Sequence, residues 1–197
     1  MGTDRSSGPP PKPLRLFIAV DVPADVKAAI EAASAPSRGL IPGARWTQPS
    51  GWHVTLKFLG WTAVRLVDEI GSAVREVASA AAPFDSASAA LGAFPNARHA
   101  RVLWAGLADP DGRFAALAGA LDERLSELVA PEGRPYMPHL TLARLTPPRN
   151  LAEFAPSLLE TPVDQRPFRV RELVLYRSHL ARAGATYEPL EVAALGD

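Results

Sequence analysis

The order of predicted strands and helices repeats once along this chain. A tetrapeptide marks the repeat, occurring as His53-Val54-Thr55-Leu56 and again as His139-Leu140-Thr141-Leu142, 86 residues further on (139 minus 53). Two copies are too few for a solenoid, in which stacked repeats build a shared core. The sequence therefore predicts one internally duplicated fold, with the tetrapeptides at equivalent places in its two halves.

The first half is predicted as strand, helix, strand, helix and strand. An apolar run over 16–20 predicts a strand, and a stripe over 26–33 that follows Pro23 predicts a helix. Residues 52–59 alternate apolar with polar side chains, which is typical of a half-buried strand. A helical stripe over 66–77 and a weaker strand over 87–94 complete this half.

The second half repeats that order. It consists of a strand over 102–107, a strongly amphipathic helix over 114–128 and a strand over 138–145. Asn150 and Glu153 form a capping pair that predicts a short helix through Leu158. We expect a final long strand over 168–176 and an edge strand over 187–192.

These elements predict an α+β fold with two pseudo-symmetric lobes. Each lobe would contain an antiparallel sheet with helices on its outer face, and the two histidine strands would meet at a central cleft, where small ligands usually bind. Residues 1–13 are rich in Ser, Gly and Pro and are expected to be a disordered leader. Residues 14–197 are then expected to form a single bilobal domain.

Composition limits the partners and the chemistry. The 21 basic residues balance 21 acidic ones, so no global field would hold a long nucleic acid, although a few arginines can bind a short piece or an end. The chain has no cysteine, which excludes disulfides and thiolate nucleophiles. It has no apolar run of 18 or more residues, so no membrane span is expected. We expect a cytoplasmic monomer.

The paired histidines favour acid–base chemistry on a phosphodiester. Imidazole titrates near pH 6.5, so near neutral pH one ring can accept a proton while the other donates one. In-line cleavage needs such a base and such an acid on opposite sides of phosphorus. His53 and His139 are the candidates, in either order, and the hydroxyls of Thr55 and Thr141 can donate to the non-bridging oxygens.

Other chemistries lack their sequence patterns. The chain contains no GxSxG, GxxxxGK[ST], HExxH or strand-linked GxGxxG motif, and neither tetrapeptide has a nearby carboxylate to complete a zinc site. We expect no metal and no cofactor. A single His-x-Thr is more often structural than catalytic, but two copies at equivalent places favour catalysis. His99 and His179 lack such a neighbour and are expected on the surface.

Three further residues are candidates for substrate binding. Arg144 can neutralise phosphate charge, but strict alternation from His139 puts it on the opposite face of the strand unless a β-bulge re-aims it. Lys57 has the same parity as His53, although it can also point to solvent. Tyr136 can stack on a base or pack in the core.

The paired motifs resemble the hallmark of the 2H phosphoesterases, and the chain is similar in particular to the RNA 2',3'-cyclic phosphodiesterases, historically called 2'-5' RNA ligases. The segments that carry the similarity are residues 15–23, 45–46, 53–60, 101–104, 134–144 and 172–178. They span nearly everything after the leader. Met137 departs from the family, whose members often have a basic residue there, and Trp52 replaces a commoner aliphatic residue.

This resemblance implies metal-independent hydrolysis of a terminal RNA 2',3'-cyclic phosphate to a 2'-phosphate, with water attacking and the 3' oxygen leaving. It makes His53 the proton donor and His139 the proton acceptor, with Thr55 and Thr141 holding the phosphate. The implied partners are RNA ends or short oligonucleotides. Joining of ends through a 2'-5' bond is implied as a weak reverse activity.

Two alternatives stay open. One is a non-catalytic module that binds RNA ends or nucleotides, against which the intact histidines and threonines of both motifs count. The other is a 2H phosphodiesterase that acts on 2'-5' oligoadenylates or on a cyclic nucleotide metabolite. The sequence separates these poorly, because specificity is determined by loops around the cleft.

Overall fold

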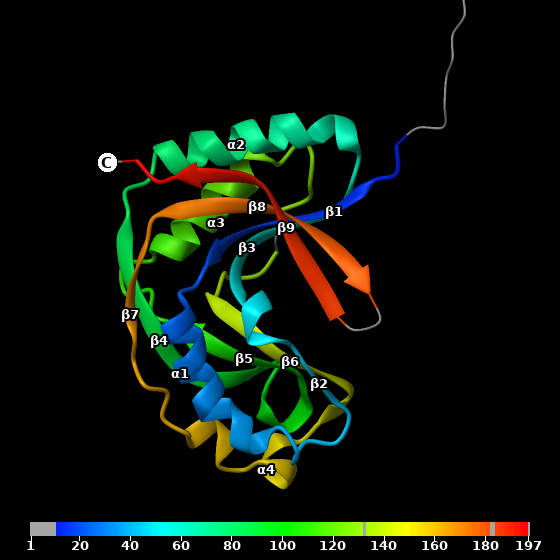
Figure 1. Ribbon diagram of the computed structural model, residues 1–197, viewed down its shortest axis with the longest axis vertical. Helices are drawn as coiled ribbons and strands as arrows, with labels where there is room; N and C mark the ends of the chain where they lie inside the picture. Colours follow the sequence, from blue (N-terminus) through cyan, green and yellow to red (C-terminus); the bar gives the residue numbers. More distant parts are fainter. Residues whose placement is uncertain (1–10, 132, 182–183, 197) are drawn as a thin grey trace, which may run out of the picture.

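A computed structural model of the protein describes residues 11–131, 133–181 and 184–196, arranged as two antiparallel sheets with helices against them (Figure 1). The strand order is β3-β1-β8-β9 in the four-stranded sheet and β2-β6-β5-β4-β7 in the five-stranded sheet. The predicted α+β class is therefore confirmed. The expected disordered leader, except for residues 11–13, lies outside the described residues.

The elements have the following bounds. The four-stranded sheet contains β1 (Leu14–Asp21), β3 (His53–Thr62), β8 (Glu172–Ala181) and β9 (Gly184–Ala194). The five-stranded sheet contains β2 (Ala44–Trp46), β4 (Phe84–Phe94), β5 (Ala100–Leu107), β6 (His139–Arg149) and β7 (Pro167–Val170). The helices are α1 (Ala24–Ser34), α2 (Val67–Ser79), α3 (Arg113–Arg124) and α4 (Leu151–Phe154). Short 3-10 helices are Ala35–Ser37, Pro49–Gly51, Val64–Leu66, Ala97–His99 and Leu158–Glu160.

The apolar stripes of the helices face the sheets, as their periodicity predicts. Ile70, Val74 and Val77 of α2 are buried, and this helix packs on β8 and β9. α3 contacts β3 and α2, whereas α1 lies against β4. The buried side chains of both sheets belong to one continuous hydrophobic core, so the two motif strands rest on a common packed support.

The duplication is present, but each half of the chain gives two strands to the sheet of the other half, β2 and β4 from the first half and β8 and β9 from the second. β1 and β3 come from the first half and pair with each other, and β1 also pairs with β8 from the end of the chain. β4 closes the first half and pairs with β5 of the second. The four-stranded sheet is therefore built from both ends of the sequence.

The predicted final strand over 168–176 is wrong in one respect, because it is two strands. Residues 167–170 form β7, which pairs with β4, and residues 172–181 form β8, which pairs with β1. The chain passes from one sheet to the other at Arg171, although Phe168, Val170 and Leu173 are all buried. The edge strand expected over 187–192 is present as β9, and the short strand β2 was not predicted.

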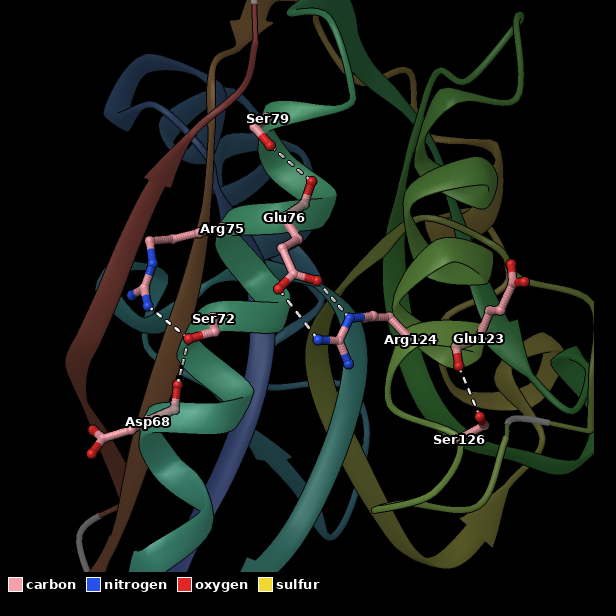
Figure 2. A network of polar contacts seen from close by, with 8 residues as sticks. All are labelled: Asp68, Ser72, Arg75, Glu76, Ser79, Glu123, Arg124 and Ser126. Atoms are coloured by element: carbon pink, nitrogen blue, oxygen red, sulfur yellow. Dashed lines mark hydrogen bonds and ion pairs between the residues drawn. The ribbon is translucent and has the colours of Figure 1, made fainter.

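Helices α2 and α3, one from each half, lie side by side and are joined by an ion pair (Figure 2). The Arg124 Nε lies 2.6 Å from a carboxylate oxygen of Glu76. Both side chains are exposed, and exposed ion pairs of this kind contribute little to stability. A hollow of about 410 Å³ lies between the same helices, lined mainly by apolar side chains such as Val77, Phe84 and Leu117. It contains no histidine. None of the helices in the described part of the chain is long and apolar enough to cross a membrane.

Candidate active site

The two tetrapeptides meet where the sheets join. His53 is the first residue of β3 and His139 the first residue of β6, and these two strands contact each other. The rings are close enough for a positive charge on His139 to disfavour one on His53. Two equivalent imidazoles from distant parts of the sequence therefore share one site.

Both imidazole rings are held in the same way. The Nδ1 atom of His53 lies 2.8 Å from the carbonyl oxygen of Gly51, and the Nδ1 atom of His139 lies 2.8 Å from that of Met137. A carbonyl oxygen can only accept a hydrogen bond, so Nδ1 carries the hydrogen in both rings. In the neutral imidazole this leaves the lone pair on Nε2, the atom available to exchange a proton.

Aromatic side chains pack on both rings. Phe17 of β1 stacks on His53 with 4.5 Å between ring centroids, and Tyr187 of β9 meets it edge-on at 4.9 Å. Phe94 of β4 meets His139 edge-on at 5.0 Å. These contacts fix the planes of the rings and exclude water from one side of each.

Burial has an electrostatic consequence for both histidines. It lowers the pKa of His53 to about 4, against a smaller raising effect of the hydrogen bond to Gly51. Burial also lowers the pKa of His139, opposed by the bond to Met137 and reinforced by the positive charge of Arg144. The neutral form of each ring is therefore favoured in the free protein.

A β-bulge follows each motif at the same point. Thr55 pairs with Ala19 while Lys57 pairs with the preceding Ile18, so Leu56 is the extra residue in β3. In β6, Thr141 pairs with Trp104 and Ala143 with Leu103, so Leu142 is the extra residue. A bulge of this kind reverses the alternation beyond it. Side chains three residues after each threonine therefore return to the face of that threonine.

The bulge re-aims Arg144. Strict alternation would place it away from His139, but with Leu142 as an extra residue Arg144 projects from the face of His139 and Thr141. Its side chain is exposed, and its charge acts on His139. The equivalent residue of the first motif is Phe58, over whose ring the Arg15 guanidinium lies at 4.5 Å from the centroid. An arginine thus follows only the second of the two motifs.

The bulge at Leu56 in β3 turns Lys57 away from the site, and the prediction that it binds substrate is wrong. Lys57 is only 1% exposed, and its ammonium pairs with the carboxylate of Asp122 on α3. It also donates to the carbonyl of Ala130 at 3.2 Å. The residue has the right parity by counting, but the extra Leu56 moves it to the helix-covered face, where it connects β3 to a helix of the second half.

Tyr136 is also placed differently from the base-stacking interpretation. Its hydroxyl donates to the carbonyl oxygen of Thr55 at 2.9 Å, and burial raises its pKa. The residue just before the second motif is therefore hydrogen-bonded to the backbone of the first. The ring packs against the hydrophobic core, which agrees with the other prediction made for this residue.

A second cross-connection runs in the opposite direction. Trp52, just before the first motif, donates from its indole Nε1 to the hydroxyl of Thr47 at 2.7 Å, and that hydroxyl donates to the carbonyl of Thr141 at 2.8 Å. We call these two links, through Tyr136 and through Trp52 and Thr47, the reciprocal braces. They fix the two motifs relative to each other through buried polar contacts, which the sequence did not reveal.

Three aromatic residues of the site were not among the predicted site residues. Phe17, Phe94 and Trp104 were predicted only as strand residues, yet all lie beside a histidine. Gly92 has a related role, since a Cβ atom there would lie 2.1 Å from the Trp104 ring. Among the described residues, no group of three or more His, Cys, Asp and Glu side chains is arranged to hold a metal ion.

The remaining histidines lie outside the site. His99 is exposed in the 3-10 helix Ala97–His99, and His179 is exposed on β8, with its Nε2 atom 2.7 Å from Glu188. The prediction that both are surface residues is confirmed. His179 lies within β8 rather than after the last long strand.

The pKa of His53 predicts how stability depends on pH. The unfolded chain has an ordinary histidine pKa near 6.5, so below that pH it binds more protons than the folded protein, whose His53 pKa is about 4. The contribution of His53 to the free energy of unfolding is therefore fully present above pH 6.5. It falls by about 2–3 kcal/mol as the pH approaches 4. Urea unfolding should show that the free energy of unfolding falls less between pH 7.5 and pH 4.5 for His53→Gln than for the wild type. Equal losses would contradict the assignment.

Comparison with known proteins relates the chain to one family. A family model described as the 2'-5' RNA ligase superfamily matches residues 22–182. A curated relative from Methanothermobacter thermautotrophicus, named RNA 2',3'-cyclic phosphodiesterase, is 32% identical over 182 residues, which cover 91% of this chain and 97% of the relative. A relative of the same name from Thermus thermophilus is 32% identical and covers 90% of this chain and 88% of its own length.

Solved structures agree with this placement. A crystal structure of a Thermus thermophilus protein superposes with a TM-score of 0.75 at 30% identity and covers 93% of this chain and all of that one (100%). The crystal structure of Escherichia coli LigT complexed with 3'-AMP has a TM-score of 0.72 at 25% identity, with 94% and 100% covered. The similarity therefore extends over both halves of the fold.

Proposed function

This chain belongs to the 2'-5' RNA ligase superfamily, and from that membership and the geometry of the site we propose that it opens RNA 2',3'-cyclic phosphates by two-histidine acid–base catalysis. It is a 2',3'-cyclic phosphodiesterase, in agreement with relatives of that name aligned over most of its length. One observation supports the mechanism above all others. His53 and His139, at equivalent places, are both held through Nδ1 and both leave Nε2 for proton exchange.

The proposed reaction proceeds in line at phosphorus. His139 Nε2 takes a proton from water as the water oxygen bonds to phosphorus, and the bond from phosphorus to the 3' oxygen breaks. His53 Nε2 gives its proton to that oxygen, which leaves as the 3'-hydroxyl. The product is a 2'-phosphate, and proton return through solvent restores both histidines. Each of the two catalytic groups is expected to contribute about 100- to 10,000-fold.

The threonines and Arg144 are proposed to hold the phosphate. Thr55 and Thr141 project from the same faces as their histidines and can donate hydroxyl hydrogens to the non-bridging oxygens, on which charge builds in the transition state. Arg144 reaches the same face through the bulge, and a guanidinium can bind two phosphate oxygens at once. We propose a monomeric enzyme, because one chain supplies both motifs.

The surroundings of His139 favour the role of proton acceptor that the family resemblance implies. The charge of Arg144 favours the neutral, proton-accepting form of His139. Burial and the positive charge of Lys27 lower the pKa of His53 in the free protein, against a smaller raising effect of Asp21. A bound phosphate adds negative charge at the site and so promotes protonation of His53, the proton donor.

The same site accounts for a weak 2'-5' ligation, which we propose as a side reaction. If a 5'-hydroxyl of a second RNA replaces water, its oxygen bonds to phosphorus and the 3' oxygen again leaves. The product is then a 2'-5' phosphodiester. Water competes with this hydroxyl throughout, so hydrolysis is expected to dominate.

The test uses an oligonucleotide that ends in a 2',3'-cyclic phosphate. Incubation with the protein in EDTA should yield a 2'-phosphate end, because neither proton transfer requires a metal ion. Product identity is read by digestion with enzymes specific for 2'- or 3'-phosphates, or by chromatography against standards. A 3'-phosphate product would refute the regiochemistry, and binding without turnover would favour the non-catalytic alternative. Faster turnover of 2'-5' oligoadenylates would favour the other phosphodiesterase alternative.

A further inference from the structure

Two arginines lie directly opposite each other beside the catalytic site. β2 pairs antiparallel with β6 so that Arg45 is opposite Arg144. Side chains at directly opposite positions project from the same face, with Cβ atoms about 4.5–5.5 Å apart. Both side chains are exposed. The bulge at Leu142 places Arg144 on the face of His139, so Arg45 shares that face.

Nothing within the described part of the chain balances this pair of charges through an ion pair. Arg75, Arg124 and Arg169 each lie against a carboxylate, whereas no such contact involves Arg45 or Arg144 there. Like charges directly opposite each other destabilise a strand pair. The arrangement therefore costs stability in the free protein, and an anion bound between the two side chains would remove that cost.

The position of the pair indicates which anion this is. Arg144 projects from the face of His139 and Thr141, where the proposed function places the reacting phosphate. Arg45 lies one strand further out, on the edge strand of the sheet. In the other direction from β6 the same face carries the aromatic side chains Trp104 and Phe94. On this face, the positive side chains therefore lie between the site and the sheet edge at β2. The aromatic rings lie on the other side of the site, toward β5 and β4.

The segment that carries Arg45 is held firmly against β6. Thr47, which follows β2, donates from its backbone N–H to the carbonyl of Leu142 at 2.9 Å and from its hydroxyl to that of Thr141 at 2.8 Å. Binding groups are most effective when their backbone is fixed by such contacts. The brace through Thr47 therefore also fixes Arg45 at a set distance from the catalytic motif.

We propose that Arg45, beside the Arg144 that holds the cyclic phosphate, binds the phosphodiester group immediately upstream of it. The enzyme would then distinguish the end of an RNA chain, which has this group, from a cyclic mononucleotide, which lacks it. Arg is suited to this because its planar fork matches phosphate oxygens. This inference rests on the proposed function, and it specifies the substrate as a chain of at least two nucleotides.

The test compares a dinucleotide ending in 2',3'-cyclic phosphate with 2',3'-cyclic AMP. For the wild type, kcat/KM should be higher for the dinucleotide, and Arg45→Gln should reduce that preference about tenfold or more, as expected for a charge-assisted hydrogen bond. The preference should also shrink with added salt in the wild type. Arg65→Gln is the matched control, since Arg65 is exposed in the 3-10 helix that follows β3, and it should keep the preference.

A binding measurement separates this proposal from the proposed function. Calorimetric Kd values for a dinucleotide 3'-phosphate and for 3'-AMP should differ in the wild type and become similar in Arg45→Gln, whether or not cyclic phosphates are hydrolysed. Thermal unfolding of Arg45→Gln should occur at an unchanged or higher temperature, because repulsion is relieved. The proposal would be overturned if the wild type bound the dinucleotide 3'-phosphate and 3'-AMP equally well. It would also be overturned if Arg45→Gln weakened the binding of both ligands equally and unfolded at a lower temperature.

Discussion

Replacing either His53 or His139 with alanine should reduce kcat for cyclic phosphate hydrolysis by about 100- to 10,000-fold. Each substitution removes one of the two proton transfers, and the remaining imidazole cannot serve both sides of phosphorus at once. The rings contribute little to folding through their own polar contacts, since each makes one hydrogen bond to a neighbouring carbonyl. The variants are therefore expected to fold, as circular dichroism and thermal melting can verify.

His99→Ala is the matched control, because His99 is exposed and lies outside the motifs; it should retain wild-type kcat. The double variant His53→Ala/His139→Ala should be only slightly slower than the poorer single variant, because residues that act as a unit give non-additive losses. Hydrolysis close to the wild-type rate in either single variant would eliminate the two-histidine mechanism.

The second large effect concerns stability and the buried pair Lys57–Asp122. Asp122→Ala would leave the Lys57 ammonium, 1% exposed, without its counter-charge, which typically costs about 3–5 kcal/mol. Lys57→Met keeps the length of the side chain and removes the buried charge, so it should cost less. Urea unfolding at neutral pH, with kcat measured on the folded fraction, would give both values.

The exposed pair Glu76–Arg124 provides the control (Figure 2). Arg124→Met also breaks an ion pair of α3, but in solvent, and should change the free energy of unfolding much less than Asp122→Ala. If Lys57→Met proved more damaging than Asp122→Ala, the buried charge would be a net stabiliser and the expected order of the two variants would be wrong.

Much of the fold could be predicted because strand and helix periodicities are local properties. The stripe of Ile70, Val74 and Val77 fixes a helix face regardless of what covers it. The division of 168–176 at Arg171 could not be predicted, because apolar side chains continue on both sides of it. Which sheet a strand joins depends on partners far away in the sequence, and alternation alone contains no information about them.

The site shows the same limit at a finer scale. Counting by twos from His53 placed Lys57 on the catalytic face and counting from His139 placed Arg144 off it, and the bulges at Leu56 and Leu142 reverse both. The possibility of a bulge could be stated from the sequence, but its position could not. The braces through Tyr136 and Thr47 could not be predicted either, since both connect residues at least 80 positions apart.

The exchange of strands between the two halves also determines when the chain can fold during synthesis. One of the two neighbours of β1 in the sheet, β8, is made about 150 residues after β1 (Figure 1). Until then one edge of β1 has no partner, and an unpaired edge can join strands of other chains. Nascent chains therefore reach a sheet complete on both sides of β1 only after β8 has been made. Truncation before residue 172 should leave a product prone to aggregation.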